Sequence, residues 1–116
     1  MLQKSINSFL CAYRGLKTTW VEERNFRIEV FAFTVVTFFI IYFKFSFVET
    51  AFCVLAMTLV LSAEIVNTAI EDLCNFVEPE HNYIIGKIKD TMGGFVFVTV
   101  LGAITIGILV FYTHFF

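Results

Sequence analysis

The sequence predicts an all-α membrane protein in which an N-terminal amphipathic surface helix is followed by three transmembrane helices. Of the 116 residues, 59% are hydrophobic and 16 are Phe, and the mean hydropathy is +0.84. A soluble domain of this size could not bury so much apolar surface. Three long apolar runs follow a basic amphipathic segment, with no repeat, linker or low-complexity tract between them. We therefore expect a single domain over residues 1–116.

The surface helix is predicted over residues 1–27. Apolar side chains recur there at spacings of three and four, and five of the eight Lys and Arg residues lie among them. A helix of this kind lies in the plane of the lipid headgroups. We expect it to be a surface helix and not a signal peptide, because it has no uninterrupted apolar core followed by a cleavage site. Its apolar positions are Leu2, Ile6, Phe9, Leu10, Tyr13, Leu16 and Trp20.

Transmembrane helices are predicted at about 28–47, 50–73 and 91–114. The third run is the clearest, because residues 91–113 contain no charged residue and are enough to cross a hydrocarbon core of about 30 Å. Residues 44–49 are predicted to form a tight turn, and residues 75–89 the one long loop.

The distribution of basic residues predicts the orientation. Residues 1–27 hold five Lys and Arg residues and the long loop holds two, whereas only Lys44 lies on the opposite side. By the positive-inside rule the N-terminus and the long loop are cytoplasmic. The net charge is only −2 and the basic residues adjoin the membrane, so no nucleic-acid partner is expected.

The most informative feature is a polar stripe inside the second apolar run, formed by Glu64, Asn67 and Glu71. Spacings of three and four place these side chains on one face of a helix. An ionised side chain at membrane depth costs about 2.5–3.5 kcal/mol, so such residues face a protein interior and mark functional sites. The stripe predicts a polar site near the cytoplasmic membrane boundary.

This layout suits phosphoryl transfer from a nucleotide to a buried alcohol. Carboxylates can hold Mg²⁺, and lysines near a helix N-terminus, such as Lys87 and Lys89, can hold nucleotide phosphates. A deeper carboxylate such as Glu64 can take a proton from a lipid hydroxyl.

Three segments carry a resemblance to a known family: Glu64-Ile-Val-Asn67-Thr-Ala-Ile-Glu71, Glu23-Arg-Asn-Phe-Arg27 and Gly86-Lys-Ile-Lys89-Asp90. Over nearly its whole length the chain resembles the small trimeric bacterial membrane kinases that phosphorylate diacylglycerol or undecaprenol. The resemblance implies an ATP- and Mg²⁺-dependent lipid kinase that forms a homotrimer in the bacterial cytoplasmic membrane. The Glu-Arg-Asn-Phe-Arg segment slightly favours undecaprenol over diacylglycerol.

The same resemblance implies a role for each matching residue. Glu64 is the expected catalytic base, and Glu23 and Glu71 are expected to hold Mg²⁺ on the ATP phosphates. The further nucleotide contacts are Glu80, Lys89 and Asp90, and the substrate contacts are Trp20, Arg27 and Asn67.

Two positions depart from the family pattern. Asn75 stands where the family commonly has Asp, and the loop reads Glu80-His81-Asn82 where the family often has Glu-Tyr-His. Both departures concern the expected nucleotide contacts. The segment Gly15-Leu-Lys17-Thr18 also lacks the spacing of a P-loop.

Other interpretations of these residues stay open at this point. Glu64 could be a structural carboxylate hydrogen-bonded across a helix interface, and Glu23 could be a solvated residue at a helix end. Lys89 and Asp90 could be a snorkelling lysine and a helix N-cap. At the level of function, the alternatives are a small oligomeric proton or ion pathway and a non-catalytic membrane subunit.

Overall fold

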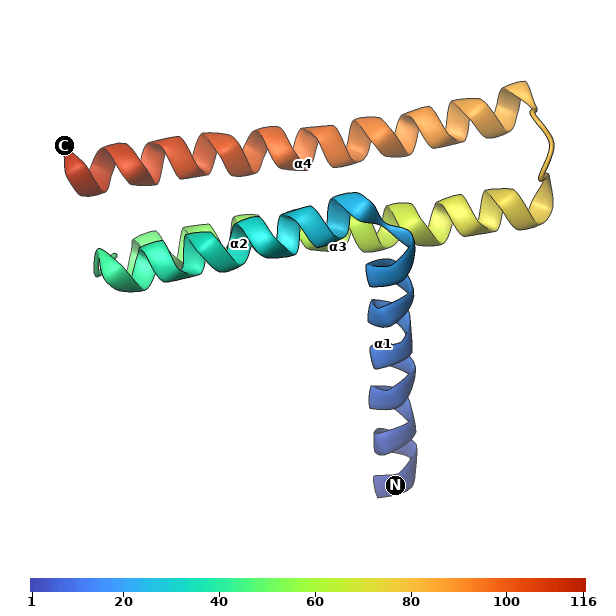
Figure 1. Cartoon of the computed structure of the whole chain (residues 1–116), viewed down its shortest axis with the longest axis horizontal. Helices are drawn as coiled ribbons and strands as arrows, with labels where there is room; N and C mark the ends of the chain where they lie inside the picture. Colours follow the sequence, from blue (N-terminus) through green and yellow to red (C-terminus); the bar gives the residue numbers. More distant parts are fainter.

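The structure, a computed structural model, describes all 116 residues and consists of four α-helices without a β-strand. In chain order they are α1 (Leu2–Glu22), α2 (Arg24–Tyr42), α3 (Phe47–Val77) and α4 (Tyr83–Phe115). Helices α2, α3 and α4 run side by side, whereas α1 leaves them at a steep angle (Figure 1).

The predicted fold class is confirmed. Helices α2, α3 and α4 are each long and apolar enough to cross a membrane. Helix α1 is amphipathic and points across the direction of the other three, as a helix lying along the membrane surface would (Figure 1).

The first helix ends earlier than the sequence suggested. Glu23, with extended backbone angles, separates α1 from α2, so the predicted helix over 1–27 is broken at this residue. We call the segment 20–27 the elbow. The predicted span over 28–47 is also displaced, because α2 ends at Tyr42 and a turn follows it.

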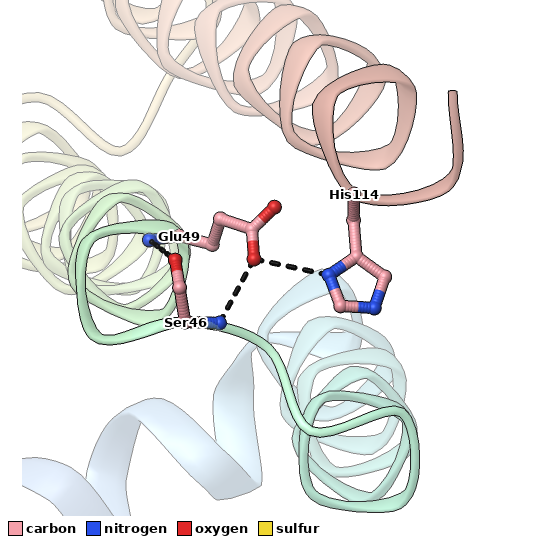
Figure 2. Close-up of polar contacts among 3 residues, drawn as sticks. All are labelled: Ser46, Glu49 and His114. Carbon is pink, nitrogen blue, oxygen red and sulfur yellow. Dashed lines mark hydrogen bonds and ion pairs between the residues drawn. The ribbon is translucent and has the colours of Figure 1, made fainter.

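Helix α3 begins inside the predicted turn because Ser46 and Glu49 form a capping box. The Ser46 Oγ accepts from the Glu49 backbone N–H at 3.1 Å, and the Glu49 Oε1 accepts from the Ser46 backbone N–H at 2.8 Å (Figure 2). The turn before it holds Lys44 at a positive φ of 54°. The chain therefore reverses within a few residues.

Glu49 also joins the start of α3 to the end of α4. Its Oε1 lies 3.0 Å from the Nδ1 of His114 (Figure 2). The imidazole ring in turn packs on Phe45, with a distance of 4.3 Å between ring centroids. This pair closes the hairpin at the end opposite to the elbow.

The connection between α3 and α4 is shorter than predicted. The long loop was expected over 75–89, but only residues 78–82 lie outside the two helices. Asn82 caps α4, because its side-chain oxygen accepts from the backbone N–H groups of Ile84 and Ile85. Asp90 lies inside α4, so its interpretation as a helix N-cap is wrong.

Few side chains are buried within the single chain. Most large apolar side chains are exposed, as in a membrane protein whose outer face meets lipid. The main buried seam lies along one face of α3, and one acidic residue belongs to it. Its members are Cys53, Ala56, Val60, Ala63, Glu64, Thr68 and Cys74.

Candidate active site

Two pairs of acidic side chains meet where the elbow contacts α3. The carboxyl groups of Glu23 and Glu71 lie within hydrogen-bonding reach of each other. Partial burial and the neighbouring Glu71 raise the pKa of Glu23 to about 6. Next to this pair, contact with the Asp72 carboxyl raises the pKa of the exposed Glu22. No cationic side chain bonds to either pair.

The pair of Glu23 and Glu71 fits a Mg²⁺ ion. Carboxylate oxygens are the hard ligands that Mg²⁺ prefers, and a cation between two carboxylates removes their mutual repulsion. No group of three or more His, Cys, Asp or Glu side chains is arranged as a protein cage for a metal. Mg²⁺ bound with a nucleotide does not need one, because phosphate oxygens and water complete its shell.

Glu64 occupies a much drier place on the same helix. Its exposed fraction is only 1%, and neither carboxylate oxygen has a hydrogen-bond donor. Across the α2–α3 interface its carboxyl lies within hydrogen-bonding reach of that of Glu29. When both groups are ionised, two carboxylates this close repel each other.

The contact with Glu29 argues against a purely structural role for Glu64. The side chain does meet a partner across a helix interface, but that partner is a second acid, and one of its oxygens also lacks a donor. Buried polar groups in a purely structural role normally have donors or cations around them. The arrangement is therefore typical of a site that handles a proton.

Asn67 and Glu71 face α4 across a small cavity of about 200 Å³. Lys89 lines the α4 side of this cavity, so three of the predicted site residues share one space. The Nζ of Lys89 also donates to the Oδ1 of Asn75 at 2.8 Å. Asn75 is the position that departs from the family pattern. Its neutral amide orients Lys89 by hydrogen bonding and does not neutralise the charge of the lysine.

The remaining predicted nucleotide contacts lie around the loop at this end of the hairpin. Glu80 and Lys89 line a pocket of about 270 Å³ that also includes His81. Asp90 lines a larger groove of about 490 Å³ at the N-terminus of α4, which Lys89 does not line. Lys89 and Asp90 therefore lie close together but open onto different spaces.

Trp20 and Arg27, the predicted lipid contacts, lie at the elbow. The Arg27 guanidinium donates hydrogen bonds to the backbone carbonyls of Trp20 and Val21. The indole ring of Trp20 is about half exposed and meets the edge of Phe26, with 6.5 Å between ring centroids. Both predicted lipid contacts adjoin Glu23.

Glu29 was not among the predicted site residues, although it lies against the predicted catalytic base in the structure. An ionisable residue in an apolar run is itself a signal of function, and Glu29 near the start of the first run carries that signal. The pairing of Glu49 with His114 was also missed, because 65 residues separate the two side chains.

Together, the acid pair open to solvent, the lysine beside it and the buried carboxyl on the same helix are typical of membrane enzymes that act on lipids at the bilayer surface. The sequence model described as prokaryotic diacylglycerol kinase matches residues 10–111. The chain belongs to this family and is a lipid kinase.

Individual relatives agree with this assignment. The diacylglycerol kinase of Escherichia coli (strain K12) is 23% identical over 104 residues, which cover 90% of this chain and 85% of that protein. The undecaprenol kinase of Bacillus subtilis (strain 168) is 30% identical over 110 residues, which cover 95% and 89% respectively. Of the functions left open by the sequence, the enzyme is therefore retained over the ion pathway and the non-catalytic subunit.

Proposed function

We propose that this kinase transfers the γ-phosphate of ATP, with Mg²⁺, to the hydroxyl group of a membrane lipid alcohol. The observation that carries the proposal is the difference in environment between two glutamates of α3. Glu64 is buried without a donor, whereas Glu71 lines a cavity shared with Lys89. Seven residues separate the two glutamates, which corresponds to about 10 Å along the helix. Reactive atoms between them are within reach of both side chains.

In the proposed reaction Glu64 is the general base. It takes the proton of the lipid hydroxyl as the alcohol oxygen forms its bond to the γ-phosphorus and the bond between that phosphorus and the β,γ-bridging oxygen breaks. Glu29, within hydrogen-bonding reach, orients the Glu64 carboxyl. Asn67 holds the polar head of the lipid beside it.

The nucleotide is proposed to bind at the solvent end of the same site. Glu23 and Glu71 hold the Mg²⁺ ion, which neutralises phosphate charge when bound. Lys89 contacts the phosphates, and Glu80 and Asp90 contact the rest of the nucleotide from the two neighbouring pockets.

Undecaprenol is the preferred alcohol in this proposal, with diacylglycerol as the alternative. The Glu-Arg-Asn-Phe-Arg segment of residues 23–27 supports undecaprenol, as does the higher identity to the undecaprenol kinase of Bacillus subtilis. Trp20 then lines the route by which the alcohol reaches the site, and Arg27 lies beside it.

We place the enzyme in the bacterial cytoplasmic membrane, with its N-terminus in the cytoplasm, as a homotrimer. The excess of Lys and Arg near the elbow and the α3–α4 loop supports this orientation. The trimer is supported by the exposed apolar surface and by the glycines of α4, where a second helix could approach closely.

The test is a lipid phosphorylation assay with the purified chain, Mg²⁺-ATP, and undecaprenol or diacylglycerol in separate reactions. We expect lipid phosphate from both and the higher rate with undecaprenol. Glu64→Gln should lower the rate at least about 100-fold, the usual contribution of a general base. Glu49→Gln, the same change at the far end of α3, should leave the rate near that of the wild type.

Each outcome has a distinct meaning. Lipid phosphate formed equally fast by wild type and Glu64→Gln would exclude Glu64 as the base. A higher rate with diacylglycerol would overturn the substrate preference alone. Absence of lipid phosphate with either alcohol would overturn the proposed reaction.

A further inference from the structure

The elbow between α1 and α2 is held by one polar side chain. The last carbonyl groups of an α-helix have no partner within the helix and must bond elsewhere. At the end of α1, two of these carbonyls, those of Trp20 and Val21, accept hydrogen bonds from Nη1 of Arg27 in α2. No other side chain forms a hydrogen bond between the two helices.

This hydrogen bonding acts directly on the orientation of Glu23. The two accepting carbonyls lie two and three residues before Glu23, and the guanidinium comes from a residue four positions after it. The backbone N–H of Arg27 also bonds to the Glu23 carbonyl at 3.3 Å. The bend that turns the Glu23 side chain toward Glu71 is thus held from both sides.

We propose that Arg27 is a positioning residue for the metal site: it caps α1 and fixes the angle of the elbow, and thereby holds Glu23 beside Glu71. The inference rests on the proposed role of Glu23 in holding Mg²⁺. It gives Arg27 a task that differs from contact with the lipid, since the side chain acts here through the backbone and through Glu23.

The chemistry of the side chain explains why an arginine is suited to this task. A guanidinium presents several N–H donors in a rigid plane, and its positive charge is favourable at the C-terminal end of a helix. The ammonium of a lysine carries the same charge on a flexible stem and lacks the planar geometry. Lysine should therefore restore part of the function and methionine none.

The experiment compares Arg27→Met and Arg27→Lys with Arg24→Met in full-length protein. Arg24 is the matched control, because it adjoins Glu23, is exposed and makes no side-chain hydrogen bond. Three quantities are measured: the Mg²⁺ concentration for half-maximal rate, the KM for the lipid, and the quenching of Trp20 fluorescence by iodide. Trp20 is the only tryptophan, so its emission reports the elbow in the absence of any substrate.

For Arg27→Met we expect about a tenfold rise in the Mg²⁺ requirement, from the loss of a charged hydrogen-bond donor. The lipid KM should stay within about twofold, and Trp20 quenching should change. Arg27→Lys should give an intermediate Mg²⁺ requirement, and Arg24→Met should match the wild type. If Arg27→Met does not fold, the intermediate behaviour of Arg27→Lys carries the test.

Two results would overturn the inference. A raised lipid KM with unchanged Mg²⁺ requirement and unchanged Trp20 quenching would make Arg27 a lipid contact. Wild-type behaviour of Arg27→Met in all three measurements would show that the hydrogen bonds do not hold the elbow. Glu23→Gln separates this inference from the proposed function. If that variant keeps the wild-type Mg²⁺ requirement, the metal role of Glu23 fails, whereas the quenching of Trp20 still tests the elbow.

Discussion

Binding of Mg²⁺ should weaken steeply as the pH falls through about 6. Partial burial and the adjacent Glu71 raise the pKa of Glu23 to about 6 in the metal-free protein. A carboxylate must be ionised to bind a metal, so below this pH a proton competes with Mg²⁺ for Glu23. The experiment lowers the pH from about 7 to about 5 and measures Mg²⁺ binding in the absence of lipid.

The magnitude follows from the titration of one group. With a pKa of about 6, only about one Glu23 side chain in eleven is ionised at pH 5, so the Mg²⁺ affinity should fall about tenfold between pH 7 and pH 5. A glutamate with the ordinary pKa of 4.5 would lose less than about twofold over this range.

Without metal, the folding stability should depend on pH in the opposite direction to the Mg²⁺ affinity. Because the folded protein raises the pKa of Glu23, the contribution of this residue to stability is present below the ordinary pKa of 4.5 and is lost as the pH rises through about 6. Mg²⁺ should restore stability above this pH by binding the ionised pair. Thermal unfolding with and without Mg²⁺ should therefore diverge as the pH increases.

Binding can be followed by calorimetry with Mg²⁺, or by electron paramagnetic resonance with Mn²⁺ in its place. Glu22→Gln is the matched control, since it removes the neighbouring carboxyl that contacts Asp72. It should keep most of the pH dependence, because Glu22 is the smallest of the causes that raise the pKa of Glu23. Glu23→Gln should bind weakly at every pH. A wild-type affinity that stays flat between pH 5 and pH 7, or a full pH dependence retained in Glu23→Gln, would show that protonation of Glu23 does not control Mg²⁺ binding.

Three further predictions concern other parts of the chain. Asn75→Asp turns the 2.8 Å contact with Lys89 into an ion pair that competes with phosphate, so the KM for ATP in steady-state assays should rise about fivefold. His114→Ala removes the bond to Glu49 and should lower the free energy of unfolding by about 1–2 kcal/mol, measured by denaturant titration, with kcat unchanged. Because the N-terminus is proposed to be cytoplasmic, the exposed Cys11 should react with a membrane-impermeant maleimide in inside-out vesicles but not in intact cells.

Much of the fold could be predicted from two features of the sequence: the length of the three apolar runs and the basic amphipathic segment that precedes them. The ends of helices were harder, since they depend on local hydrogen bonds that overrode composition. Ser46 and Glu49 have the spacing of a capping box and could have shown that α3 begins at Phe47. Asn82 similarly starts α4 well before the uncharged run on which the predicted span was based.

The candidate site was predictable only within one helix. The period of an α-helix placed Glu64, Asn67 and Glu71 on one stripe. It could not show that Glu64 meets α2 through Glu29, whereas Glu71 meets both the elbow and α4. Such contacts depend on how helices pack and on the bend at Glu23, neither of which a single-helix pattern contains.

The different surroundings of Glu64 and Glu71 support the different roles that we propose for these two glutamates of one helix. Glu64 is sealed from water, where a carboxyl can meet the hydroxyl of an apolar alcohol without competition from solvent. Glu71 opens onto a cavity with Lys89, where a charged nucleotide and its metal can arrive from the aqueous side. In the proposed reaction, environment more than residue type separates the roles of the two glutamates. Exchange of either glutamate for glutamine should therefore affect different quantities: the rate of transfer for Glu64, and the Mg²⁺ requirement for Glu71.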